Sequence, residues 1–130
     1  HQDQTLQAGM FRMIPRAKLF VSSAGCDGVF GDGKWRLLQA VKEHGSISAA
    51  AAALGRSYRK AWGDIKRAEE ALGRPLVTKV RGGQDGGQSV LTDFCEKLLV
   101  AWGKYRNQAH ASIKTAYARH LEDLIGPTGS

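Results

Sequence analysis

The sequence predicts a mainly helical fold with three short helices, one small β-hairpin and a long C-terminal helix. Three observations predict it. Helix-ending glycines followed by capping serines divide the middle of the chain into short helices. Four glycines lie between two short extended runs near residue 85, which is typical of a hairpin. From Thr92 onward apolar residues recur every three or four positions with no proline until Pro127, which indicates one long helix. Together these features predict a winged helix-turn-helix.

The first elements precede this core. Residues 17–22 are the right length for a strand, and Val29 with Phe30 can pair with it across a turn-rich stretch. We expect Asp32 to cap a helix that runs from Gly33 to about His44. Its buried side is predicted to contain Leu37, Leu38 and Val41, with Trp35 as a further anchor.

The next two helices form the helix-turn-helix. Ser46 can cap a small-residue helix from Ile47 to Leu54, and Gly55 suits the left-handed position that ends it. Ser57 can cap the following helix. There Ala61, Ile65, Ala68 and Leu72 share one face, whereas Arg59, Lys60, Gly63, Lys66 and Arg67 share the other. One face is predicted to pack and the other to meet a ligand.

The charge distribution indicates the kind of ligand. The 130 residues contain 19 Lys and Arg against 12 Asp and Glu, a formal net charge of +7. Between Arg56 and Arg81 there are eight cations and only three anions. A clustered excess on one helix and the hairpin after it favours nucleic acid over a merely solubilising surface.

The hairpin beside this helix reads as a wing. Gly73 and Pro75 end the helix, and Leu76 to Val80 and Gln88 to Leu91 are predicted to be extended. The loop from Arg81 to Gly87 would be its tip. A phosphate-cradling P-loop is disfavoured, because no Gly-Lys-Ser/Thr follows and the loop leads into a strand.

We expect the helix that begins at Ser57 to enter a DNA major groove, with Arg59 as the best candidate for reading guanine. Tyr58 has a competing role, packing in the turn while its hydroxyl reaches a phosphate. Trp62 is expected to be core. The predicted base contacts are Ser57, Tyr58, Arg59 and Lys60. The predicted backbone contacts are Ser46, Ser48, Arg56, Lys66, Arg67, Lys79 and Arg81.

Thr92 can cap the last helix, which is predicted to continue to Ile125. Its apolar stripe is longer than a small domain can cover, so a second copy of the chain is the simplest partner. The alternative is a helix folded back on its own domain, with Gly103 as a kink. The residues expected in the dimer interface are Phe94, Leu98, Trp102, Tyr105, Ile113, Tyr117 and Leu121.

Other function classes lack a signature. Cys26 and Cys95 are far apart and no histidine cluster accompanies them, so we expect neither a metal site nor a cofactor. No catalytic constellation is recognisable, so the protein is not expected to be an enzyme. Without an apolar run of about 20 residues or a signal peptide, a cytoplasmic protein is expected.

We interpret residues 1–16 as a tag remnant and flexible N-terminus, 17–91 as the DNA-binding domain, 92–125 as the dimerisation helix and 126–130 as a flexible tail.

Several runs resemble the N-terminal DNA-binding domain of molybdate-responsive (ModE-type) transcriptional regulators. They include Gly45-Ser-Ile-Ser-Ala-Ala, Ser57-Tyr-Arg-Lys-Ala-Trp62, Gly73-Arg-Pro-Leu-Val77 and the glycine pairs of the wing, within residues 17–105. The first run is shared with LysR-type regulators. The resemblance implies a winged helix that binds a palindromic operator as a homodimer through its terminal helices.

The chain also departs from that family. Members that sense molybdate carry small β-barrel domains after the DNA-binding part, and nothing after Ile125 can supply one. We therefore expect no molybdate site in this chain, whether it is a stand-alone DNA-binding version or a part of a longer protein. The wing is interrupted by Gln84, Asp85 and Gln88, and Asp85 would repel phosphate at the tip. A winged helix that binds only proteins is the alternative function, for which an apolar or acidic recognition face would be expected.

Overall fold

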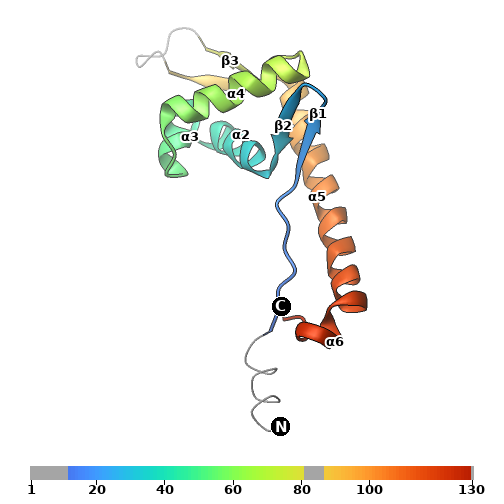
Figure 1. The fold of residues 1–130 in the computed structure, drawn as a ribbon. Helices are drawn as coiled ribbons and strands as arrows, with labels where there is room; N and C mark the ends of the chain where they lie inside the picture. Colours follow the sequence, from blue (N-terminus) through green and yellow to red (C-terminus); the bar gives the residue numbers. More distant parts are fainter. Residues whose placement is uncertain (1–11, 81–86, 130) are drawn as a thin grey trace. The chain divides into compact units, whose positions relative to one another are not determined.

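The computed structural model describes residues 12–80 and 87–129. Its helices and strands follow in the order β1 (Phe20–Ser23), β2 (Cys26–Gly31), α2 (Asp32–His44), α3 (Ile47–Ala53), α4 (Tyr58–Leu72), β3 (Val77–Lys79), β4 (Ser89–Leu91), α5 (Asp93–His120) and α6 (Glu122–Ile125). The chain divides into two compact units, residues 18–103 and residues 104–130 with 1–17. Figure 1 shows α4 running across α2 in the first unit, with α3 at its N-terminal end. The predicted mainly helical, winged helix-turn-helix fold with a long C-terminal helix is confirmed.

Strands β1 and β2 form an antiparallel hairpin that leads directly into α2, as expected from residues 17–22, Val29 and Phe30. Gly31 pairs with Phe20, and a Cβ at Gly31 would lie 2.7 Å from the Cβ of Phe20. Only glycine allows the two strands to approach this closely.

The expected cap at the start of α2 is wrong. Gly31 occupies the N-cap position without a side-chain hydrogen bond, and the helix begins at Asp32. The carboxylate of Asp32 is buried and accepts hydrogen bonds from the Leu19 backbone N–H at 3.1 Å and the Trp102 indole N–H at 2.9 Å. Asp32 therefore ties the strand and α5 to the start of α2.

The boundaries within the helix-turn-helix follow the predicted caps. Gly45 ends α2 with a φ of 85°, in the left-handed region that favours glycine. Ser46 Oγ accepts from the backbone N–H of Ala49 at 3.0 Å, and Ser57 Oγ accepts from that of Lys60 at 3.1 Å. Each serine thus satisfies a backbone donor in the first turn of its helix.

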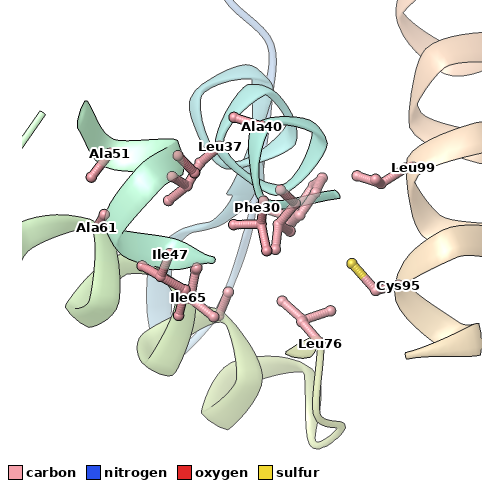
Figure 2. Close-up of a cluster of buried hydrophobic side chains, with 14 of the residues drawn as sticks. Phe30, Leu37, Ala40, Ile47, Ala51, Ala61, Ile65, Leu76, Cys95 and Leu99 are labelled. Carbon is pink, nitrogen blue, oxygen red and sulfur yellow. The ribbon is translucent and has the colours of Figure 1, made fainter. Parts of the chain in front are cut away.

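One hydrophobic core fills the unit of residues 18–103 (Figure 2). Every described helix of this unit contributes to it, including the predicted packing face of α4 and the predicted buried side of α2. Its largest fully buried side chains are Phe30, Leu37, Leu38, Ile65, Leu76, Val41 and Cys95. Trp35, which was expected to be an anchor, packs partly buried against this core.

The base of the wing is fixed to the helices. Strands β3 and β4 are antiparallel, with Val77 opposite Leu91 and Lys79 opposite Ser89. The Glu69 carboxylate on α4 accepts from the backbone N–H groups of Leu76 and Val77, and the Ser89 N–H donates to the Gly45 carbonyl at 2.8 Å. The wing therefore leaves the domain in a direction set by α4 and by the end of α2.

Thr92 caps α5 as predicted, since its Oγ1 accepts from the Cys95 N–H at 3.1 Å. The helix is continuous through Gly103 and ends at His120, where the sequence pattern predicted continuation to Ile125. The separate short helix α6 follows Leu121. The helix-length prediction was therefore five residues too long, because the three-to-four spacing persists across this turn.

The unit formed by the two ends of the chain has its own contacts. Met13 and Thr128 form an isolated parallel bridge, and Tyr117 Oη donates to the Gly126 carbonyl at 2.7 Å. These hydrogen bonds involve parts of the segments that were expected to be flexible, 1–16 and 126–130. Within the described residues, no helix combines the length and apolar character needed to span a membrane.

Candidate nucleic-acid interface

The face of α4 opposite the core is polar and exposed. Ala61, Ile65 and Ala68 are buried, so the helical period places Arg59 on the opposite side. Arg59 is exposed, and among the described residues it forms no ion pair. A guanidinium in this position can donate two parallel hydrogen bonds to a planar acceptor pair.

The N-terminal turn of α4 contains the other residues predicted to contact bases. Tyr58 is 50% exposed, and Lys60 is exposed as well. Ser57 Oγ is engaged in capping, which leaves its hydroxyl hydrogen for a further acceptor. The exposure of Tyr58 does not fit the alternative in which its ring packs in the turn.

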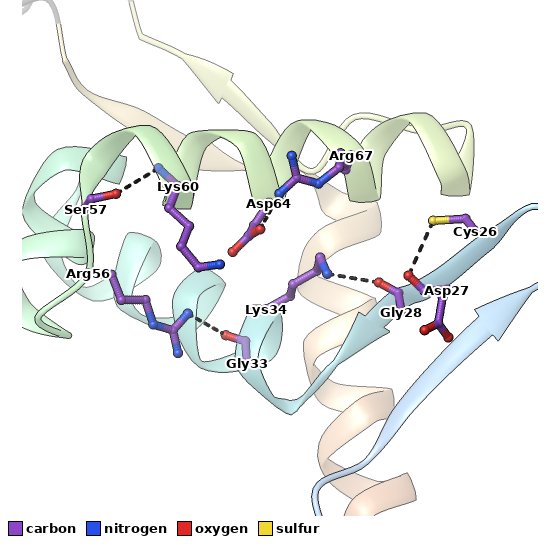
Figure 3. Close-up of polar contacts among 10 residues, drawn as sticks. All are labelled: Cys26, Asp27, Gly28, Gly33, Lys34, Arg56, Ser57, Lys60, Asp64 and Arg67. Carbon is purple, nitrogen blue, oxygen red and sulfur yellow. Dashed lines mark hydrogen bonds and ion pairs between the residues drawn. The ribbon is translucent and has the colours of Figure 1, made fainter.

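The two flanks of α4 differ in character. Lys60, Asp64 and Arg67 lie on one flank, where Figure 3 shows them on the side of α4 nearest Lys34 and β2. The other flank carries Trp62 and, seven residues on, Glu69, whose carboxylate accepts from the β3 backbone. The second flank therefore faces the wing, and the first faces the start of α2.

Trp62 is not a core residue, contrary to expectation. Its side chain is 42% exposed, and the Lys66 ammonium lies 5.6 Å from its ring centroid. One residue of α4 corresponds to a rotation of about 100°, which moves Trp62 off the face that Ala61 buries. Trp62 is thus an exposed aromatic side chain on the wing flank, which the apolar pattern of the sequence did not predict as a contact residue.

The cations predicted to contact the DNA backbone in the middle of α4 have carboxylate partners. Arg67 donates to Asp64 at 2.6 Å, and Lys66 lies 3.2 Å from the Glu69 carboxylate. Ion pairs three residues apart on a helix contribute only a few tenths of a kcal/mol, and the two cations are themselves exposed, so they can exchange their partners for phosphate. A Cβ at Gly63 would lie 3.3 Å from the Arg67 guanidinium, so glycine leaves room for that side chain along the helix.

The remaining predicted backbone contacts surround α4. Ser46 Oγ is used as a cap, Ser48 is exposed, and the Arg56 guanidinium donates to the Gly33 carbonyl at 3.1 Å. Lys79 is exposed at the end of β3. Arg81 lies outside the described residues. The structure thus brings Arg56 and Lys60 to one side of α4 and Lys79 to the wing.

The residues predicted to form a dimer interface have different environments. Trp102 is only 6% exposed and packs edge-on against Phe30, so most of its surface is covered within its own chain, and its role in an interface stays a prediction. Phe94 and Leu98 pack partly buried against the same core, and Tyr117 is buried within the unit of the chain ends. Ile113 is half-buried, whereas Tyr105 and Leu121 are 49% and 42% exposed.

No group of three or more His, Cys, Asp or Glu side chains in residues 12–80 and 87–129 is placed to hold a metal ion. The candidate site is the cationic, exposed face of α4 with the wing beside it, and its side chains can offer charge and hydrogen-bond donors to a ligand.

Comparison with known proteins agrees with this geometry. Residues 33–96 match the family of bacterial regulatory helix-turn-helix proteins of LysR type. This segment is similar to LysR-type helix-turn-helix domains. The fold is also similar to that of the CbnR DNA-binding domain in a crystal structure with DNA, with a TM-score of 0.54 and 23% identity over 67% of this chain and 94% of that one.

Molybdenum-related proteins are also similar to this part of the chain, which confirms the predicted ModE-type resemblance. The molybdenum-pterin-binding proteins MopB and MopA of Rhodobacter capsulatus are 46% and 36% identical over 67 and 87 residues, and cover 52% and 67% of this chain. The transcriptional regulator ModE of Haemophilus influenzae is 36% identical over 77 residues, 58% of the chain. The aligned segments are 25%, 32% and 30% of these three proteins. The family is one of DNA-binding transcriptional regulators.

Proposed function

We propose that this protein is a sequence-specific regulator that binds double-stranded DNA by placing α4 in the major groove. The observation that carries the proposal is the outward face of α4, where Arg59 is exposed and without an ion-pair partner in the described residues. A free guanidinium at this point suits the paired acceptors N7 and O6 of guanine. Tyr58 is the second candidate for a base contact.

The flanks of α4 supply contacts that hold the helix in register. Lys66 lies on the wing flank and Arg67 on the α2 flank, so each can reach one of the two phosphate chains that border the groove. Ser48, Lys79 and Arg81 extend the predicted backbone contacts beyond α4. Trp62, exposed beside Tyr58, is placed to make apolar contact with a thymine methyl or a sugar.

We further propose that two copies bind a palindromic site. Large apolar side chains are exposed on the unit that contains the chain ends. These side chains are Ile14, Tyr105, Leu121, Leu124 and Ile125. Tyr105 and Leu121 belong to the residues predicted for the dimer interface. Burial of such a set against a second copy would join two DNA-binding units in one molecule, and a two-fold symmetric protein binds a palindromic site whose half-sites are one helical turn or a multiple of it apart.

Selection of bound duplexes from a random pool, at a fixed and stated salt concentration, tests this function. We expect enrichment of a two-fold symmetric sequence whose half-sites are centred about 10 base pairs, or a multiple of that, apart. A bound pool without sequence preference would refute specific recognition, and an enriched site without symmetry would refute the dimer. Failure of the chain to bind duplex would favour the protein-binding alternative.

A further inference from the structure

A cavity of about 420 Å³ lies beside the flank of α4 that faces away from the wing. It is bounded by the β1–β2 hairpin, the start of α2 and the first two turns of α4. All of its lining residues lie within the unit of residues 18–103. Figure 3 shows the side of the cavity where Lys60 extends from α4, and Arg56 from the turn before it, toward α2.

The cavity lining is strongly cationic. It contains two carboxylates and five cations, which are Lys18, Lys34, Arg36, Arg56 and Lys60. None of these five cations forms an ion pair with any described residue. Lys34 Nζ donates to the Gly28 carbonyl at 3.0 Å and Arg56 to the Gly33 carbonyl, so neutral backbone oxygens fix two of them at the cavity.

The five cations outnumber the two carboxylates in the lining, so a positive excess remains when both carboxylates are counted. The Asp32 carboxylate is buried and accepts from the Leu19 and Trp102 N–H groups. The Asp64 carboxylate is paired with Arg67 at 2.6 Å. Like charges gathered in a recess raise its potential, and an anion is the ligand that such a recess attracts.

We propose that this cavity binds a phosphate of the DNA backbone. The inference rests on the proposed function, and it adds the β1–β2 hairpin and the start of α2 to an interface that was predicted to comprise only the helix-turn-helix and wing. With Lys60 on its α4 side, the cavity adjoins the helix that reads the major groove, so it lies where one of the phosphate chains bordering that groove would pass. Phe20, which is 60% exposed at the rim, offers an apolar surface to a sugar.

The salt dependence of DNA binding tests the proposal with two matched variants of the full chain. One carries Lys18→Gln and Arg36→Gln, which remove two exposed cations of the cavity that form no ion pair in the described chain. The control carries Lys97→Gln and Lys104→Gln on α5, with the same change in charge. We expect the slope of log K against log salt to become shallower by about one for the first variant relative to the control, as for one lost phosphate contact. Equal slopes would overturn the proposal.

Replacement of single phosphates of the selected site by neutral methylphosphonates locates the contact. For the wild-type protein we expect one flanking phosphate whose neutralisation weakens binding several-fold, and this loss should vanish in the cavity variant but persist in the control. If no phosphate behaves in this way, the proposal is wrong. It is equally wrong if inorganic phosphate occupies the cavity while the DNA slope is unchanged. Absence of DNA binding by the wild-type protein would instead refute the proposed function itself.

Discussion

The carboxylate of Asp32 accepts a hydrogen bond from the indole Nε1 of Trp102 at 2.9 Å, across 70 residues of sequence. The same carboxylate accepts from the Leu19 N–H, so one buried anion connects the first hairpin, α2 and α5. Because the Trp102 donor is buried and the Leu19 donor is partly buried, removal of the carboxylate would cost both of these hydrogen bonds where water replaces them poorly. This junction fixes the start of α2, and with it one wall of the cavity beside α4.

Replacement of Asp32 by Ala is therefore expected to lower the free energy of unfolding by about 3 kcal/mol, from the loss of two hydrogen bonds to a charged group. Urea unfolding measures this change. Asp27→Ala is the matched control, because Asp27 is exposed and is expected to cost less than about 1 kcal/mol. A loss for Asp32→Ala no larger than that of the control would show that the junction does not stabilise the domain.

The two cysteines are expected to differ in reactivity. Cys95 is fully buried, and burial, followed by the charges of Glu96 and Glu69, raises the pKa of its thiol to about 12. Since the thiolate is the reactive form, iodoacetamide at pH 8 should modify Cys26 in the folded protein and Cys95 only after unfolding. Mass spectrometry of the labelled peptides distinguishes the two. Equal labelling under native conditions would contradict this placement.

The raised pKa of Cys95 also predicts a direction for stability at high pH. A thiol whose pKa is higher in the folded than in the unfolded protein favours folding while it is protonated. Its contribution is complete below the unfolded pKa and is lost as pH rises from about 9 toward 12. The urea midpoint of the wild-type protein should therefore fall over this range more steeply than that of Cys95→Ala, and parallel declines would refute the assignment.

Trp62 offers a spectroscopic report on the interface. Because it is exposed on α4 whereas Trp102 is in the core, DNA binding is expected to change the emission of Trp62 most. Titration of the wild-type protein with the DNA site that it selects should quench the tryptophan fluorescence of the protein. The Trp62→Phe variant should lose most of that change while it still binds the DNA. Persistence of the full signal in Trp62→Phe would place Trp62 away from the DNA.

The dimer proposal makes a prediction about exposed apolar residues. Introduction of Asp at both Leu121 and Leu124, which are 42% and 79% exposed, should convert a dimer to a monomer because two charges would be buried without partners. Light scattering after size-exclusion chromatography measures the mass. Val100→Asp is the control, since Val100 is 61% exposed but lies off the stripe. The interface would be ruled out if the wild-type chain were monomeric or if the double variant stayed dimeric.

Sequence alone was sufficient for the helix-turn-helix because its signals are local. Gly45, Ser46 and Ser57 act on backbone groups within a few residues, so each could be interpreted from its immediate neighbours. Thr92 is a further case of this kind. Such caps depend on the geometry of a single turn and hardly at all on the rest of the fold.

The features that sequence did not predict depend on distant contacts. Asp32 resembles an N-cap, and its real partners, Leu19 and Trp102, come from other elements. Trp102 continues the stripe of α5, yet the stripe does not show which of its residues the domain itself covers. The cavity could not be predicted either, because residues 18–60 supply its cations from separate segments without a linear motif.

Comparison of Arg59→Ala with the wild-type protein, on the selected site and on random duplex, tests the central claim most directly. If Arg59 reads a base, its loss should cost about 1 to 3 kcal/mol on the selected site and much less on random DNA. The specificity at the guanine that it contacts should relax at the same time. Equal losses on both duplexes, with specificity unchanged, would contradict the claim that the exposed face of α4 reads sequence.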